Sequence, residues 1–131
     1  MDPAYGITRR LPDVDFDQAI DRTTVALTSE GFGVLTEIDV KATLKQKLGV
    51  DFRRYRILGA CNPPLAHRAL TTEPAIGLLL PCNVVVTEEE SGGSTVSAAA
   101  PKEMFRVVDN PKLGPIVEEV EAKLRRALDS I

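Results

Sequence analysis

The feature that most constrains the fold is the stretch of residues 78–86 (LLLPCNVVV), in which every residue except Asn83 is apolar. A strand that is apolar on both faces must be covered on both sides. In a chain of 131 residues, helices can cover one face of such a sheet. A second copy of the chain is the economical way to cover the other face, so this stretch predicts a homodimer.

The rest of the chain alternates between strand-like and helix-like patterns. In residues 55–61, period-two alternation places Leu58 and Ala60 on one face and Tyr55, Ile57 and Cys61 on the other. Apolar stripes with helical spacing follow Asp15, Asp39 and Asn62, which are natural N-cap residues, and another follows Pro115. The expected strands are 5–11, 33–38, 55–61, 78–86 and 94–100, and the expected helices are 16–27, 40–48, 63–73 and 115–128.

This order, β-α-β-(α)-β-α-β-β-α, predicts an α+β fold with an antiparallel sheet and helices on one face. The length suits a single domain spanning residues 1–131. No run of about 18 apolar residues is present, so no transmembrane helix is expected. Residues 1–5 show no secretory signal pattern, so we expect a cytoplasmic protein with no membrane partner. Two reduced cysteines and no disulfide framework are then expected.

Charge is unevenly distributed along the chain. The net charge is −3, which argues against nucleic acid as a partner, yet residues 41–68 hold seven basic residues and only one acidic residue, Asp51. This basic block leads up to Cys61. Such a block is usually a solvated surface. The alternative is that it attracts a small anionic ligand.

Two Cys-Asn pairs are the strongest candidates for a site. Cys61 precedes Asn62, and a thiol just before a helix N-terminus feels the positive end of the helix dipole, which favours the thiolate. The plainer interpretation is a small packed cysteine beside an Asn62 that only caps the helix. Cys82 and Asn83 form the second pair, and Cys82 could equally be a packed core thiol.

His67, the only histidine, follows Cys61 by six residues. Two cysteines and one histidine form a candidate soft-metal set, but their spacing matches no zinc pattern, so no metal site and no named cofactor are expected. The candidate ligand-binding set is therefore Cys61, Asn62, Cys82, Asn83 and His67.

Three motifs in order resemble a known family. Residues 31–39 (GFGVLTEID), 58–63 (LGACNP) and 77–84 (GLLLPCNV) are similar to the bacterial domain-of-unknown-function 302 family, and the resemblance covers about residues 5–130. It implies a fold like one half of the TATA-box-binding protein: β-α-β-β-β-β-α with a curved antiparallel sheet, here with short inserted helices. It also implies a dimer, and it carries no established activity, substrate or cofactor.

The preferred hypothesis is a small protein that binds a small-molecule or anionic ligand near the two Cys-Asn pairs, with an extension to thiol or redox chemistry. One alternative is a thiol-dependent enzyme with Cys61 as nucleophile and His67 as base, although the absence of an orienting third residue disfavours an enzyme. Another is a structural or interaction module in which these residues serve only as core and caps.

Overall fold

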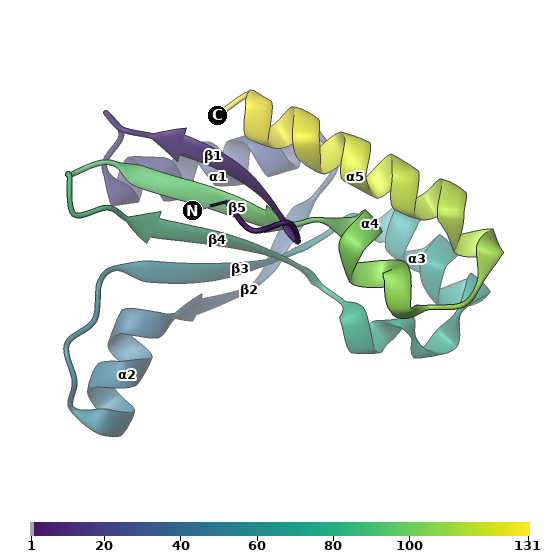
Figure 1. Cartoon of the computed structure of the whole chain (residues 1–131), viewed down its shortest axis with the longest axis horizontal. Helices are drawn as coiled ribbons and strands as arrows, with labels where there is room; N and C mark the ends of the chain where they lie inside the picture. The colour runs from purple at the N-terminus through teal and green to yellow at the C-terminus, as the bar shows by residue number, and fades with distance from the viewer. Residues whose placement is uncertain (1) are drawn as a thin grey trace.

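The fold is built on one antiparallel sheet of five strands, as Figure 1 shows for a computed structural model that describes residues 2–131. The strand order across the sheet is β1-β5-β4-β3-β2, so the first and last strands of the sequence are neighbours at one edge. The strands are β1 (Gly6–Leu11), β2 (Gly33–Asp39), β3 (Tyr55–Cys61), β4 (Cys82–Glu88) and β5 (Ser94–Ala99).

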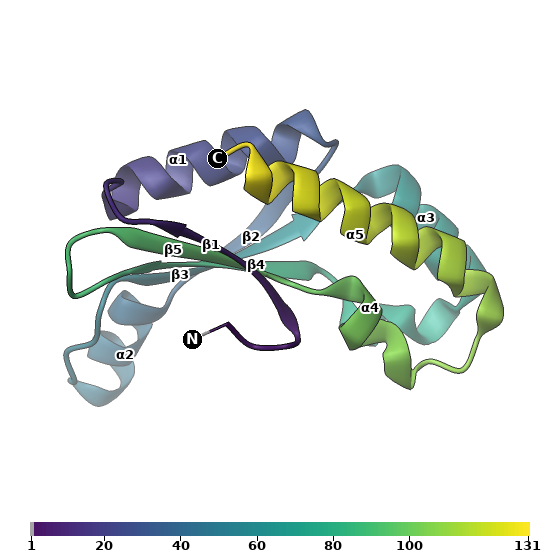
Figure 2. The same ribbon diagram turned by 45° about the horizontal axis from the view of Figure 1, so that its top comes forward.

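Figure 2 shows α1 and α5 above the sheet and α2 below it on the opposite side. α5 extends past the end of the sheet, where it packs against α3 and α4. The α-helices are α1 (Phe16–Ser29), α2 (Val40–Leu48), α3 (Pro63–Thr72), α4 (Pro101–Met104) and α5 (Gly114–Asp129). Three 3₁₀ helices are η1 (Pro74–Leu79), η2 (Phe105–Val107) and η3 (Pro111–Leu113). The predicted α+β class and element order are confirmed.

The core lies between the sheet and the pair α1 and α5. Leu58 of β3 pairs with Val84 of β4, and both side chains point to the helix-covered face and are fully buried. Leu27 of α1 and Leu124 of α5 complete this core from the other layer. Fully burying such a side chain contributes about 1.5–3 kcal/mol, so this interface carries much of the stability.

The predicted helix boundaries follow the expected caps. The side chains of Asp15, Asp39 and Asn62 each accept a hydrogen bond from a backbone N–H in the first turn of the helix that follows. Gly49 ends α2 with a left-handed φ of 68°, a conformation that costs glycine nothing because it has no Cβ. The caps and the glycine set the ends of these helices through interactions within a few residues of the sequence.

The strand predicted for residues 78–86 is wrong at its start. Residues Leu78 and Leu79 belong to η1, and β4 begins only at Cys82. Within β4, Val84 and Val86 are buried whereas Val85 is only partly covered, so burial follows ordinary alternation. Of the apolar residues before Cys82, Leu80 and Pro81 line a cavity rather than the sheet core, and Leu78 is 88% exposed. Across residues 2–131, no helix has the length and apolarity required to cross a membrane.

Candidate functional site

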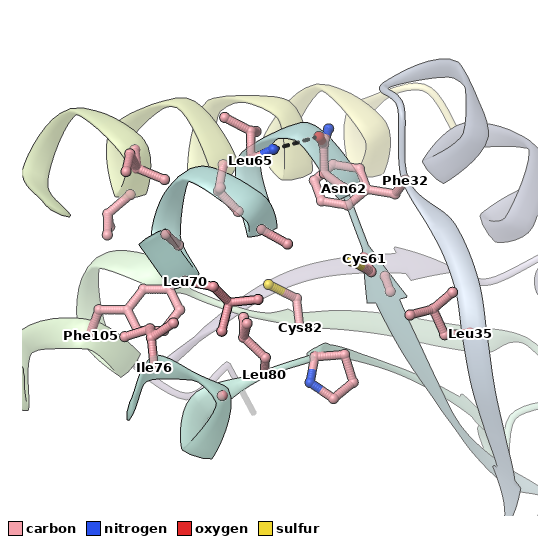
Figure 3. A pocket seen from close by; sticks show the side chains of 18 of the residues that line it. Phe32, Leu35, Cys61, Asn62, Leu65, Leu70, Ile76, Leu80, Cys82 and Phe105 are labelled. Carbon is pink, nitrogen blue, oxygen red and sulfur yellow. Dashed lines mark hydrogen bonds between the residues drawn. The ribbon is translucent and has the colours of Figure 1, made fainter. Parts of the chain in front are cut away.

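A cavity of about 380 Å³ lies at the end of the sheet where β3 finishes and β4 begins. Figure 3 shows it from close by, with side chains from α3, η1 and the two strands pointing inward. Ligand cavities in proteins commonly measure about 300–1,000 Å³, so this one is large enough for a small molecule.

The cavity wall is almost entirely apolar. No charged side chain of residues 2–131 lines it, and its only polar side chains are Thr36, Asn62 and the two cysteine thiols. The apolar lining comes from five parts of the chain: Phe32, Leu35, Ala60, Leu65, Ala66, Ala69, Leu70, Ile76, Leu80, Pro81, Phe105, Leu113, Ile116, Val117 and Val120.

Two exposed leucines lie on the solvent side of the cavity. Leu35 of β2 is 67% exposed and Leu70 of α3 is 40% exposed. β2 contains a register shift between Val34 and Thr36, which brings Leu35 out of the normal strand alternation. Leu35 therefore stands at the margin of the cavity, although it contributes nothing to the sheet core.

Cys82 is the thiol that faces the cavity most directly. Its backbone pairs with Ala60 of β3, and in Figure 3 its sulfur points into the space beside Leu70. Burial, and secondarily the nearby Cys61, raise the pKa of Cys82 to about 11. Because the nucleophilic form of cysteine is the thiolate, Cys82 is a neutral thiol near pH 7 and a poor nucleophile.

Cys61 reaches the same cavity from the next position along β3. Ala60 points toward the helices, and side chains alternate along a strand. The Cys61 side chain therefore leaves β3 on the face opposite to the helices. Figure 3 places it near Leu35, while the sulfur of Cys82 points away toward Leu70. Both thiols are free, and side chains that leave a sheet on opposite faces are poorly placed to form a disulfide.

Asn62 is buried, and both the oxygen and the nitrogen of its side-chain amide form hydrogen bonds within the protein. Its Oδ1 accepts from the backbone N–H of Leu65 at 3.4 Å, and its Nδ2 donates to the carbonyl of Glu30 at 3.2 Å. It therefore caps α3 and ties that helix to the end of α1. The bond to Leu65 is the cap that the plainer interpretation expected of Asn62, and the bond to Glu30 is an additional contact.

The remaining two candidates lie outside this cavity. Asn83 is exposed and lines a smaller neighbouring cavity of about 160 Å³ together with Ala99 and Met104. His67 is exposed on α3, where it lines a surface depression with Arg68 and Lys112. Cys61 and His67 therefore line separate spaces. Within residues 2–131 there is also no cluster of three or more metal-ligating side chains.

The basic block of residues 41–68 does not converge on the cysteines. Arg56 pairs with both Glu37 and Asp39 at the edge of the sheet. Arg68 pairs with Glu119 at 3.2 Å, and Arg54 pairs with Asp17 at 2.6 Å. None of these pairs lies at the cavity, and no charged side chain of residues 2–131 lines it.

Sequence reasoning missed most of the cavity wall. Phe105 was recognisable only as an apolar residue in a connector, and Ile116 and Val120 only as part of a helical stripe. An apolar stripe indicates that one face of a helix is buried. It does not tell whether that face packs against other side chains or lines a cavity. No signal in the sequence distinguishes these two cases.

Comparisons with known proteins agree with this fold. Residues 7–131 match the family model described as "Domain of unknown function DUF302". A crystal structure titled as the uncharacterized conserved protein DUF302 from Bacillus stearothermophilus is 31% identical, with a TM-score of 0.89, and the match covers 98% of both chains. A search of curated proteins finds no match.

Proposed function

The chain belongs to the DUF302 family, and we propose that it binds a neutral, apolar small molecule in the cavity between β3, β4, α3 and α5. The observation that carries this proposal is the chemistry of the wall. A cavity of about 380 Å³ offers apolar side chains and two thiols, with no charged group among residues 2–131. Transfer of apolar surface from water into such a space is favourable.

The composition of the cavity wall also indicates that the ligand is uncharged. A buried carboxylate or ammonium without a partner costs several kcal/mol or shifts its pKa until it is neutral. The cavity supplies no charged partner for either group, and its hydrogen-bonding side chains besides the thiols are only Thr36 and Asn62, whose amide is already bonded once at its oxygen and once at its nitrogen. The ligand class is therefore neutral, and an anionic ligand has no support from the geometry.

Thiol chemistry has weaker support than binding. The raised pKa of Cys82 disfavours its thiolate, and His67 lines a different depression from the cavity of Cys61. A thiol-dependent enzyme would need these two groups within reach of each other. The thiols instead suit the cavity as small, polarizable apolar groups.

The experiment is a titration of the purified protein with Nile red, a neutral dye that brightens in apolar surroundings. We expect saturable binding that 1-decanol displaces and decanoate at pH 8 does not. Ala66→Phe and Val117→Phe each place a ring into the cavity from a different helix and should weaken binding. Ala122→Phe, at an exposed position of α5, is the matched control and should leave binding unchanged.

Two results would contradict the proposal. One is the absence of saturable dye binding by the folded wild-type protein. The other is binding that both cavity-filling variants retain in full, because the dye would then sit elsewhere. Circular dichroism spectra of all variants check that each one is folded.

We also propose that two copies associate through the sheet face that α1 and α5 leave uncovered. Ile38, Ile57 and Val85 are paired in register across β2, β3 and β4, so they form an apolar row on that face. A self-complementary row near the middle of a sheet suits an isologous dimer. Sedimentation velocity should give a dimer mass, and Val85→Lys should give a monomer. A monomeric wild type at about 100 μM refutes this proposal.

A further inference from the structure

Residues 40–53, which comprise α2 and the loop after it, project from the body of the molecule. In Figures 1 and 2, α2 extends away from the sheet on the side opposite α1 and α5. None of its nine residues is buried. We call residues 40–53 the α2 segment.

The α2 segment is held by local interactions rather than by the core. The side chain of Asp39 caps the helix, and Gly49 ends it. The ammonium of Lys41 donates to the carbonyl of Phe52 at 2.7 Å, which fixes the loop against the helix. A nine-residue helix without burial is marginal in water, so these contacts explain how the segment folds but not why it projects.

The charge of the α2 segment is opposite to that of the rest of the chain. It holds four basic residues and one acidic residue, a net charge of +3, whereas the remaining residues carry −6. Lys45 lies 3.3 Å from the exposed Asp51. Lys47 and Arg53 have no carboxylate within 4 Å among residues 2–131. The segment is thus a cationic projection on an anionic body, and it is complementary to an anionic surface.

The end of the α2 segment is also apolar. Leu48, Val50 and Phe52 are 69%, 45% and 38% exposed, respectively, and they stand between Lys47 and Arg53. Large apolar side chains that stay exposed on a protrusion commonly mark a contact site. Basic residues flanking exposed Leu, Val and Phe are the pattern of segments that lie at the interface of a bilayer.

We propose that the α2 segment docks on an anionic lipid surface, with Leu48, Val50 and Phe52 entering the headgroup layer and Lys47 and Arg53 contacting lipid phosphates. A bilayer accepts protruding apolar side chains without a preformed pocket, whereas a folded protein partner would need a matching hollow. Nucleic acid would use the charge but would gain little from the three apolar residues. Two α2 segments facing each other would repel, which disfavours self-association through this surface.

The docked orientation also keeps the anionic body away from the lipid. Because α2 points away from α1 and α5, the segment can reach the surface first. Charge repulsion between the body and the surface is screened within about 8 Å at physiological salt. This mode requires no membrane-spanning helix and is reversible.

The test is flotation of the full-length protein with vesicles of phosphatidylcholine alone or with 30% phosphatidylserine. We expect flotation only with the anionic vesicles, decreasing from 50 to 300 mM salt. Lys47→Gln and Arg53→Gln should each weaken binding about fivefold. The double variant Leu48→Ser/Val50→Ser should also weaken it, because insertion contributes alongside charge.

Matched controls come from exposed residues elsewhere. Lys112→Gln removes a charge, and Val107→Ser removes an 81%-exposed apolar side chain, both outside the α2 segment, and neither should change flotation. The proposal is overturned if the wild type does not float with anionic vesicles at 50 mM salt, or if the α2 variants float as well as the controls. It is also overturned if duplex DNA or polyglutamate binds through the same residues while vesicles do not. Binding that responds to Lys47 and Arg53 but not to Leu48 and Val50 would refute insertion.

Discussion

Replacing Asn62 tests whether one buried side chain both caps α3 and ties it to α1. In Asn62→Ala, loss of the helix cap should cost about 1 kcal/mol. The carbonyl of Glu30 also loses the donor that now lies 3.2 Å away, and a partly buried acceptor left unpaired adds about 1 kcal/mol or more. The expected total is therefore about 2 kcal/mol.

This free energy translates into a measurable melting shift. Proteins unfold with an entropy of about 2.1 cal/mol/K per residue, so a chain of 131 residues should lose about 7 °C in Tm. The matched control is Asp15→Ala, which removes the exposed cap of α1 and nothing else, since Asp15 accepts only from Gln18 at 2.8 Å. That variant should lose about half as much, close to 4 °C.

Asn62→Asp separates the two roles of the side chain. The aspartate keeps an oxygen for the Leu65 N–H but offers no donor to Glu30 at neutral pH. Because position 62 is buried, the new carboxylate is an unpaired charge that faces the Glu30 carbonyl, so the Tm of Asn62→Asp should fall below that of Asn62→Ala although the cap is kept. Thermal melts followed by circular dichroism, with urea titrations for the free energies, are the assay. If Asn62→Ala loses no more than Asp15→Ala, the link between α3 and α1 carries no stability and the reasoning is refuted.

Two further predictions concern the thiols and the hairpin. The folded pKa of Cys82, about 11, exceeds its ordinary value of 9.0, so the contribution of Cys82 to the free energy of unfolding should be fully present below pH 9 and should be lost between pH 9 and 11. Urea titrations at pH 8 to 11 measure this loss, and an equal fall in Cys82→Ala would contradict the assignment. A Cβ at Gly93 would lie 2.6 Å from backbone atoms of Pro12, so Gly93→Ala should cost about 3 kcal/mol by overpacking. Gly33→Ala, which would contact nothing within 4 Å, should change the free energy of unfolding by less than about 0.5 kcal/mol, and equal effects for the two in urea titrations would contradict this explanation.

The error at residues 78–86 has a specific physical cause. An apolar run carries no period that separates a doubly covered strand from a short helix followed by a strand. Leu78 is in fact 88% exposed, which no hydrophobic pattern could have indicated. The prediction of a strand covered on both faces was therefore wrong for these residues, whereas residues 82–86 were correctly expected to form a strand.

The candidate residues separate in the structure. Two strands joined by one helix allowed Cys61 and Cys82 to approach each other without requiring it, and both thiols line one cavity. Asn83 and His67 lie elsewhere because a strand neighbour points to the opposite face and a helix residue can face solvent. The basic block dispersed because Arg54, Arg56 and Arg68 pair with carboxylates that are distant in sequence, such as Glu119 for Arg68, whereas Lys47 and Arg53 lie on the projecting α2 segment.

The sequence by itself determined the local structure of this protein: the caps at Asp15, Asp39 and Asn62, the helix ended by Gly49, and the alternation of β3. These features depend on interactions within a few residues, which short patterns encode directly. Only the tertiary structure decided the cavity, because its wall combines residues from Phe32 to Val120. A space left between side chains depends on how separate elements pack, and no single segment of the chain contains that information.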